Sequence, residues 1–192
     1  MIAQLKYRNI AISSKIGTGK TTLARHLEQA LGWKRLEGGE IFWEPLRKKL
    51  NLSENETDRR PDEEDLKFDQ ALKERLNKED HLIVETHLAG FDAQGIPGVF
   101  KILLVCEDAG KDQVAIRIDR IVNRNGTTVE EAKEHIESRE KKDLEKWRRL
   151  YSQGDPDWTP FNPDYFDLVI NTFNHNQEET LRLALESLGF KK

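Results

Sequence analysis

Short apolar runs alternate with amphipathic stretches along most of this chain. Five runs have the length and apolar content of buried strands, namely 9–13, 33–36, 81–85, 99–106 and 167–171. Between them, apolar residues recur at helical spacing, which predicts helices over 20–31, 40–50, from 61 onward, 111–125, 128–151 and 176–188. Strands that alternate with helices in this way predict an α/β fold with a parallel sheet.

Several residues mark where the predicted helices begin and end. Gly32 and Gly126 each follow a helical stripe, and glycine readily adopts the left-handed conformation that closes a helix. Thr128 through Glu131 has the form of a capping box, which opens a helix. Pro45 disfavours the helix over 40–50 unless a helix begins there. Polar or proline-rich loops are predicted over 51–60 and 154–163.

The chain has 192 residues, and we expect a single domain over 1–192. With 31 Lys and Arg against 35 Asp and Glu, the net charge of −4 gives no global basic surface for nucleic acid or an anionic membrane. No apolar run reaches the roughly 20 residues of a membrane helix, and residues 1–9 lack a signal-peptide core. Cys106 is the only cysteine, which excludes an internal disulfide. We therefore expect a soluble cytoplasmic monomer with small-molecule ligands, and no nucleic-acid or membrane partner.

The segment 14–22 carries the most specific chemical pattern in the sequence. The P-loop pattern G-x-x-x-x-G-K-[ST] is matched at Gly19, Lys20 and Thr21, while Ser14 stands at the first glycine position. An apolar strand precedes the segment and an amphipathic helix follows it, which is the setting of a phosphate-binding loop. The expected nucleotide-binding residues are Ser14, Lys15, Ile16, Gly17, Thr18, Gly19, Lys20, Thr21 and Thr22.

Each part of this loop has a chemical task if the ligand is ATP with magnesium. Backbone N–H groups of small residues and glycines surround a phosphate. Lys20 brings charge to the β- and γ-phosphates, and the Thr21 hydroxyl binds Mg²⁺. The alternative is a Gly-Lys pair in an ordinary loop, which the flanking strand and helix disfavour. Ser14 either has a negative φ and is tolerated there, or it weakens nucleotide binding.

A carboxylate at the end of a neighbouring strand is the usual partner of a phosphate loop. Glu85 ends the apolar run 82–84, and it would hold Mg²⁺ through water or orient the acceptor. The alternative is a strand-end carboxylate that caps a turn. We predict a catalytic and metal-binding role for Glu85, because the loop needs such a partner.

Four arginines form a candidate lid over the phosphates. Arg117, Arg120 and Arg124 recur at spacings of three and four on one helix face, and Arg139 lies on the next helix. Guanidinium groups stabilise charge on a transferring phosphoryl group, and a closing lid excludes water. The alternative is a solvated helix with i,i+4 ion pairs, which is favoured for the helix as a whole.

Five further segments can be interpreted together with the phosphate loop. They are Gly39-Glu40-Ile41-Phe42, Glu85-Thr86-His87-Leu88-Ala89-Gly90-Phe91, Arg117 through Gly126, Arg139-Glu140 with Tyr151, and Asp167-Leu168-Val169-Ile170-Asn171-Thr172. In this order they resemble the cytidylate kinase-like group of nucleoside monophosphate kinases, its archaeal type in particular. The resemblance covers nearly the whole chain.

The resemblance implies a three-layer P-loop NTPase fold with a five-stranded parallel sheet, flanking helices and a helical lid. It implies an acceptor-binding insertion at about 38–80 and a lid at about 111–151. Lys20 and Thr21 would then handle ATP and Mg²⁺. The arginines that would serve the transferring phosphate are Arg120, Arg124 and Arg139. The implied acceptor site comprises Gly38, Gly39, Arg47, Asp69 and Ala89 or Gly90.

Three positions depart from the family pattern. The first loop glycine is Ser14, the arginine after G-E-I-F is Trp43, and the arginine of E-G-R is His87. The two arginines would bind the acceptor phosphate, so Trp43 and His87 are substrate-binding residues with changed chemistry; core packing is the alternative for Trp43. Candidates to substitute are Arg47, Arg59, Arg60 and a protonated His87. A protonated His87 predicts a KM for CMP that rises from about pH 6 to 8.

The resemblance therefore predicts an ATP-dependent kinase that moves the γ-phosphoryl group to a small acceptor, a pyrimidine nucleoside monophosphate such as CMP or dCMP. Two alternatives stay open. One is a P-loop kinase with a different small acceptor, which Trp43 and His87 favour. The other is a non-catalytic ATP-binding switch module, which the presence of Lys20, Thr21 and Glu85 disfavours.

Overall fold

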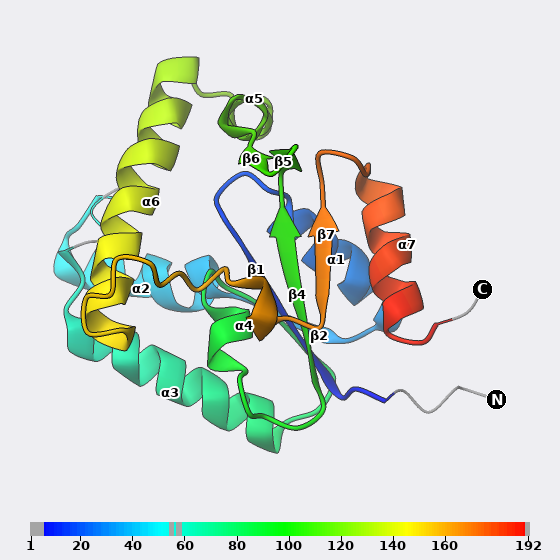
Figure 1. Ribbon diagram of the computed structural model, residues 1–192. Coiled ribbons are helices and arrows are strands. Elements are labelled where there is room, and N and C mark those ends of the chain that lie inside the picture. The colour runs from blue at the N-terminus through cyan, green and yellow to red at the C-terminus, as the bar shows by residue number, and fades with distance from the viewer. Residues whose placement is uncertain (1–5, 54–55, 57–58, 191–192) are drawn as a thin grey trace.

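The computed structural model describes residues 6–53, 56 and 59–190, and its centre is a parallel sheet (Figure 1). Five strands pair in the order β2-β3-β1-β4-β7. Their bounds are β1 Asn9–Ser14, β2 Lys34–Glu37, β3 Leu82–Glu85, β4 Val99–Val105 and β7 Leu168–Asn171. Every pairing in this sheet is parallel, and Ile12 lies beside both Glu85 and Ile102. The predicted α/β class and five-stranded parallel sheet are confirmed.

Helices cover both faces of the sheet, which gives the fold its three layers. Their bounds are α1 Lys20–Leu31, α3 Asp62–Lys78, α4 Ala89–Asp92 and α7 Gln177–Ser187. In Figure 1, α1 and α7 lie on one side of the sheet, and α3 and α4 lie on the other. Side chains alternate along β1, so Ile10 and Ile12 pack in the core shared with α1 and α7, while Ala11 packs in the opposite core. Among the described residues, no helix has both the length and the apolar character to cross a bilayer.

Two further helices stand at the carboxyl ends of the strands, in the region predicted as a lid (Figure 1). They are α5 Val114–Asn125 and α6 Val129–Tyr151. Gly126 ends α5 with a φ of 66°, and Thr128 opens α6 with the predicted capping box to Glu131. Ile16 of the phosphate loop packs with Ile121 in a small apolar cluster shared by α5 and α6. The region predicted as a lid therefore packs directly on the phosphate loop.

The first residues of the predicted helix 111–125 are not helical, which corrects that prediction. Lys111–Asp112 forms a short strand, β6, that pairs antiparallel with Glu107–Asp108, β5. Ala109 and Gly110 both have positive φ, 48° and 75°, and they turn the chain between the two strands. The helix begins only at Val114. Asp112 thereby stays outside the helix, where its carboxylate meets cations beside the phosphate loop.

The region predicted as the acceptor-binding insertion contains the helical elements η1, α2 and α3. The π-helical turn η1 spans Gly39–Trp43, and α2 spans Glu44–Leu50. Pro45 lies in the first turn of α2, where its missing N–H is not needed, so the predicted helix 40–50 has a break in its geometry at this point. Pro61 directly precedes α3, as predicted. In the predicted loop 51–60, residues 54–55 and 57–58 lie outside the described residues.

Candidate active site

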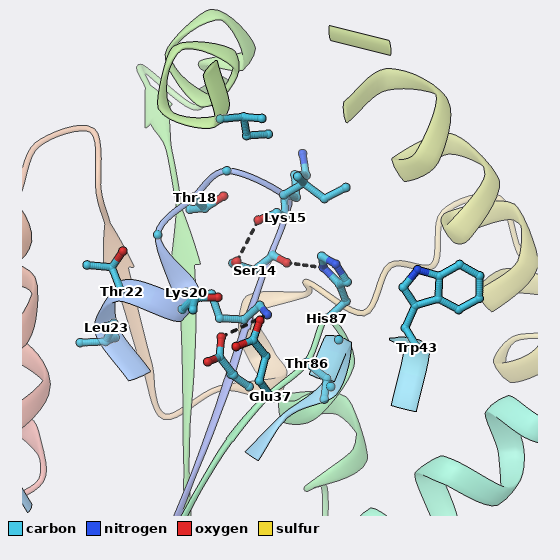
Figure 2. A pocket seen from close by; sticks show the side chains of 18 of the residues that line it. Ser14, Lys15, Thr18, Lys20, Thr22, Leu23, Glu37, Trp43, Thr86 and His87 are labelled. Atoms are coloured by element: carbon cyan, nitrogen blue, oxygen red, sulfur yellow. Dashed lines mark hydrogen bonds and ion pairs between the residues drawn. The ribbon is translucent and has the colours of Figure 1, made fainter. Parts of the chain in front are cut away.

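A cavity of about 900 Å³ opens at the carboxyl ends of β1, β2 and β3. Cavities of this size hold small molecules, and this edge of a parallel sheet is where α/β proteins bind them. The predicted site residues that line it are Ser14, Lys15, Ile16, Gly17, Thr18, Gly19, Lys20, Thr21, Thr22, Gly38, Gly39, Trp43, Asp69, Glu85, His87, Arg120, Arg124 and Arg139. One cavity thus joins the phosphate loop, the strand-end carboxylate, the lid arginines and part of the predicted acceptor site. Figure 2 shows the side of it where Lys20, His87 and Trp43 lie.

Ser14 is compatible with the geometry of the phosphate loop. It is the last residue of β1 and pairs in register with Leu104, so its backbone is extended and does not require glycine. The left-handed conformations fall later in the loop, at Gly17 and Gly19, with φ of 76° and 106°. A Cβ at Gly17 would lie 2.7 Å from the carbonyl oxygen of Arg117, so this position has no room for a side chain. The loop turns where its glycines are, and the serine stands outside that turn.

Lys20 and Glu85 form an ion pair at the base of the cavity. Lys20 Nζ lies 3.6 Å from Glu85 Oε2, and Glu85 Oε1 accepts a hydrogen bond of 2.6 Å from Arg35 Nη1. Burial lowers the pKa of Lys20 below its ordinary value, while the neighbouring Glu85 opposes that shift. The Glu85 side chain is fully buried, so the pair holds Lys20 at the first turn of α1.

Two buried side-chain oxygens in the wall of the cavity, one of them on Glu85, are of the kind that binds a hard cation. Glu85 Oε2 and the Thr18 hydroxyl are buried and have no hydrogen-bond partner among the described residues. The described part of the chain has no cluster of three or more His, Cys, Asp or Glu side chains that could hold a metal alone. Mg²⁺ commonly binds through one or two protein oxygens together with phosphates and water. Thr21 and Glu85 both line the cavity, and they stay the predicted ligands of a Mg²⁺ ion that arrives with a nucleotide.

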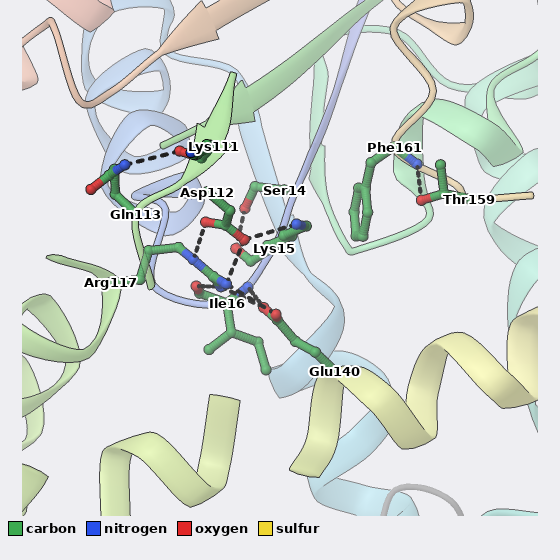
Figure 3. Close-up of polar contacts among 10 residues, drawn as sticks. All are labelled: Ser14, Lys15, Ile16, Lys111, Asp112, Gln113, Arg117, Glu140, Thr159 and Phe161. Carbon is green, nitrogen blue, oxygen red and sulfur yellow. Dashed lines mark hydrogen bonds and ion pairs between the residues drawn. The ribbon is translucent and has the colours of Figure 1, made fainter. Parts of the chain in front are cut away.

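Arg117 connects the lid to the phosphate loop (Figure 3). Its side chain is 1% exposed and donates to Asp112 Oδ1 at 2.9 Å, to Glu140 Oε1 at 2.6 Å and to the carbonyl of Ile16 at 2.7 Å. Glu140 also accepts the backbone N–H of Ile16 at 2.8 Å, and Lys15 Nζ donates to Asp112 at 2.8 Å. We call these five residues the loop–lid cluster. Helical spacing groups Arg117 with the candidate phosphate-binding arginines. Its three guanidinium nitrogens, however, all donate to Asp112, Glu140 and the carbonyl of Ile16.

Replacement of Arg117 by Met should destabilise the protein strongly. The variant leaves Asp112 and Glu140 without their guanidinium partner, and breaking a buried ion pair from one side costs about 3–5 kcal/mol. For a chain of this size we expect Tm to fall by roughly 6–20 °C. Arg182→Met removes an exposed ion pair to Glu186 and serves as the control, with Tm within about 2 °C of native. Equal Tm values for the two variants, measured by calorimetry, would contradict the assigned role.

The three predicted lid arginines occupy different settings. Arg120 Nη1 donates to the Thr172 hydroxyl at 2.9 Å and Nη2 to the Thr172 carbonyl at 2.7 Å, and the same hydroxyl donates to the Thr18 carbonyl at 3.0 Å. Arg139 Nε lies 3.4 Å from Asp143, and its side chain is 16% exposed. Arg124 is exposed and donates to the Asn125 side chain. Arg120 is therefore fixed between the phosphate loop and the end of β7, whereas Arg124 and Arg139 retain donors for a ligand.

The surroundings of His87 disfavour the protonated ring that the sequence analysis offered as a phosphate ligand. Its Nδ1 lies 2.7 Å from the carbonyl oxygen of Ser14, which can only accept, so we assign the proton to Nδ1. Burial lowers the pKa of His87 well below its usual range, and the charges of Lys20 and Arg139 add to the shift. The predicted rise of KM with pH, which needs a bound phosphate beside the ring, stays a prediction.

Arg47 and Gly90, predicted in the acceptor site, do not line the cavity. Arg47 lies on α2 and donates to Glu44 Oε1 at 2.8 Å, one helical turn back along the same helix. The N–H of Gly90 donates to the Ser13 hydroxyl at 2.8 Å, and a Cβ at Gly90 would lie 2.0 Å from the Phe166 ring. A match to the family pattern gives a residue's position in the chain but not the direction of its side chain. Here the pairing of Arg47 and the packing at Gly90 keep both residues out of the cavity wall. Arg59, another candidate, is exposed and paired with Glu56.

The acceptor half of the cavity and its surroundings contain residues to which the sequence analysis gave no role of their own. Phe42 and Phe68 stack with their ring centres 4.3 Å apart. Arg35 reaches Glu85 from β2, the edge strand, and a charged residue inside a predicted strand was the available signal. Trp147 of α6 lines the cavity with its ring centre 5.8 Å from that of His87. These aromatic groups make a platform suited to a flat ligand.

Two buried carboxyl groups meet beneath this half of the cavity. Asp69 accepts a hydrogen bond from the Tyr151 hydroxyl, and Asp92 lies 3.3 Å from Lys73 Nζ. Burial raises the pKa of Asp69 to about 6 and that of Asp92 to about 7, and for Asp92 the charge of Asp69 adds to the rise. For both groups, the folded protein therefore binds the proton more tightly than the unfolded chain does. The stability that these groups supply is complete below about pH 4 and is lost as the pH rises through about 7.

Asp92→Asn should therefore raise Tm more at pH 8 than at pH 5. At pH 5 the folded protein already holds Asp92 protonated, so the amide changes little, whereas at pH 8 the substitution removes a buried charge. The difference between the two gains is on the order of 2 kcal/mol, or about 4–8 °C. Asp80→Asn, at an exposed residue paired with Arg8, is the control and should show no such pH dependence. An equal Tm change at both pH values for Asp92→Asn would contradict the shift.

Sequence comparisons place the chain among known proteins. A family described as an AAA domain matches residues 10–148. The cytidylate kinase of Methanopyrus kandleri is 31% identical over 193 residues, which cover 93% of this chain and 93% of that protein. The cytidylate kinase of Archaeoglobus fulgidus is 26% identical over 186 residues, which cover 95% of this chain and 96% of that protein.

The fold is shared with solved kinases. A gluconokinase from Sinorhizobium meliloti superimposes with a TM-score of 0.59, covering 96% of this chain and 93% of that one at 14% identity. At such low identity the similarity concerns the fold alone. It confirms the predicted three-layer P-loop architecture, with a parallel sheet and flanking helices.

Proposed function

Because the chain belongs to the cytidylate kinase-like family of P-loop nucleoside monophosphate kinases, we propose that it transfers the γ-phosphoryl group of ATP to CMP or dCMP. The chain is an ATP-dependent phosphotransferase that resembles nucleoside monophosphate kinases. The observation that carries the finer proposal is the single cavity, which joins a phosphate loop to an aromatic compartment that contains a carboxyl group. In this proposal, 38–80 is the acceptor-binding insertion and 111–151 is the lid.

Phosphoryl transfer here needs positioning and charge more than proton transfer. The attacking group of a monophosphate is an oxygen that is already ionised near neutral pH, so no general base is required. The loop N–H groups and Lys20 would hold the β- and γ-phosphates, with Thr21 and Glu85 as the residues that would hold Mg²⁺. The ion, when bound, neutralises charge that develops between those phosphates. Arg124 and Arg139 would stabilise the transferring group from the lid.

The aromatic compartment supports a pyrimidine base as the acceptor's flat part. Phe42 and Phe68 would pack against the base, and Asp69 would accept a hydrogen bond from an exocyclic amine such as that of cytosine. An amine donor is the feature that separates cytosine from uracil, so this contact would favour CMP over UMP. Trp43 and His87 favour one competing proposal, a kinase whose small acceptor lacks a phosphate.

A screen of acceptors tests the proposal. ADP production from ATP and Mg²⁺ would be followed with CMP, dCMP, UMP, AMP, GMP and cytidine. We expect the highest kcat/KM with CMP or dCMP, and no turnover with Mg²⁺ removed by chelation. Turnover of cytidine but of no monophosphate would support the competing acceptor. Binding of ATP without turnover of any acceptor would support a switch module.

A further inference from the structure

Arg60 is a buried arginine in the wall of the acceptor half of the cavity. It precedes α3, and its side chain is 8% exposed. Its Nε donates to Asp65 Oδ1 at 2.8 Å, and its Nη2 lies 3.8 Å from Asp143, beyond hydrogen-bond distance. The bond through Nε fixes the guanidinium group and leaves the terminal nitrogens as donors that a ligand can use.

Two aromatic rings hold the plane of this guanidinium. Its central carbon lies 5.3 Å from the ring centre of Trp43 and 6.0 Å from that of Phe42. A guanidinium over an aromatic face is stabilised by the ring quadrupole and loses little freedom when it binds a ligand. Arg60 is thus an oriented fork of N–H groups, the geometry that phosphate oxygens accept.

Trp43 supplies an independent observation that points to a ligand. The residue is 6% exposed and lines the cavity, and its indole nitrogen is buried without a hydrogen-bond partner among the described residues. Figure 2 shows that nitrogen on the side of the ring where His87 lies. Indole N–H can only donate, and a buried donor without an acceptor is costly. An oxygen atom of a bound ligand would satisfy it.

Two cations from different parts of the chain lie near one carboxylate, since Arg60 Nη2 is 3.8 Å and Arg139 Nε is 3.4 Å from Asp143. The charges of Lys20 from α1, Arg139 from α6 and Arg60 all act on the ring of His87. The carboxylates of Asp65 and Asp143 balance part of this charge, and Lys146 is paired with Asp65 from the side of α6. Burial and these three cations lower the pKa of His87, so the ring adds little positive charge of its own here.

We propose that Arg60 binds the phosphate group of the acceptor nucleotide, with the indole N–H of Trp43 as a second donor and Arg139 facing the same group. This inference rests on the proposed function. The two arginines that the family pattern has at positions 43 and 87 are absent, and the corresponding charge comes here from the segment before α3. The acceptor is thereby recognised by its phosphate as well as by its base.

Paired ligands with and without the phosphate test the inference. Dissociation constants for CMP and cytidine would be measured by calorimetry on the native protein and on Arg60→Gln. The variant should bind CMP about 10- to 100-fold more weakly, because charge-assisted hydrogen bonds to the phosphate are lost, and cytidine within about twofold of native. Arg75→Gln, which breaks a pair to Glu79 on the outer part of α3, is the control and should leave both constants unchanged.

A second variant keeps the inference falsifiable if Arg60→Gln fails to fold by circular dichroism. Trp43→Phe keeps an aromatic ring at this position and removes the indole N–H. It should weaken CMP binding by about 3- to 10-fold and leave cytidine binding unchanged. If Arg60→Gln binds CMP as tightly as the native protein does, the proposed phosphate contact is overturned. Equal losses of affinity for CMP and cytidine in either folded variant would also overturn it. Neither result would affect the proposed function. No CMP binding by the native protein would overturn the proposed function as well, and this is seen before any variant is made.

Discussion

Replacement of Lys20 by Ala removes phosphoryl transfer without unfolding the protein. We expect kcat to fall by about a thousandfold or more, because the ammonium group stabilises negative charge on the β- and γ-phosphates. The fold should persist, since Glu85 keeps its 2.6 Å hydrogen bond to Arg35 after Lys20 is lost. Initial rates of ADP formation at saturating ATP and acceptor measure the effect.

The same variant separates binding of a triphosphate from binding of a monophosphate. Affinity for ATP should fall more than affinity for AMP, because Lys20 acts at the β,γ end of the nucleotide. Lys78→Ala on the exposed end of α3, where Lys78 pairs with Glu74, is the control and should keep native rates. Unchanged turnover in Lys20→Ala would remove this residue from the mechanism.

The lid arginines should divide into two kinds when each is replaced by Ala. Arg124→Ala and Arg139→Ala should lower kcat on the order of a thousandfold with little change in ATP affinity, because their charge is needed in the transition state. Arg120→Ala should also weaken ATP binding. This side chain donates a hydrogen bond to Thr172, and Thr172 in turn donates to the Thr18 carbonyl of the phosphate loop. Values of kcat and KM for ATP, measured at saturating acceptor, separate the two kinds.

Two results would speak against this division. Near-native kcat in Arg124→Ala and Arg139→Ala would make the lid a solvated surface. Equal effects of all three variants on KM for ATP would mean that the contacts of Arg120 to Thr172 do not support ATP binding. Calorimetric Tm values accompany each measurement, so that a loss of fold is not mistaken for a loss of catalysis.

The strands and helices could be predicted because their signals are local. Each strand of the main sheet lies within one residue of its predicted bounds, and the capping box at Thr128 and the glycine at Gly126 mark the lid joint as expected. The β5–β6 hairpin had no such signal, because its turn begins with Ala109, a residue that seldom has positive φ. The short helix Ala89–Asp92 also escaped prediction, since four residues are too few to show a periodicity.

The site was predictable where its residues are contiguous, and less so where tertiary packing decides. The phosphate loop lines the cavity throughout 14–22, because a strand, a turn and a helix fix it together. Arg117 and Arg120 look alike in sequence, yet one is buried between two carboxylates and the other lies at the end of β7. Arg47 pairs along its own helix, whereas Arg60 enters the cavity from a loop. No periodicity or motif distinguishes these cases.

The loop–lid cluster limits which parts of this enzyme could be exchanged with a relative. A chimera that receives a foreign 111–151 would have to bring its own partners for the backbone of Ile16 and for Lys15. It would also need a backbone at position 117 that tolerates the close approach of Gly17. The smallest transplantable piece is therefore the loop together with the lid, although 101 positions separate Ile16 from Arg117.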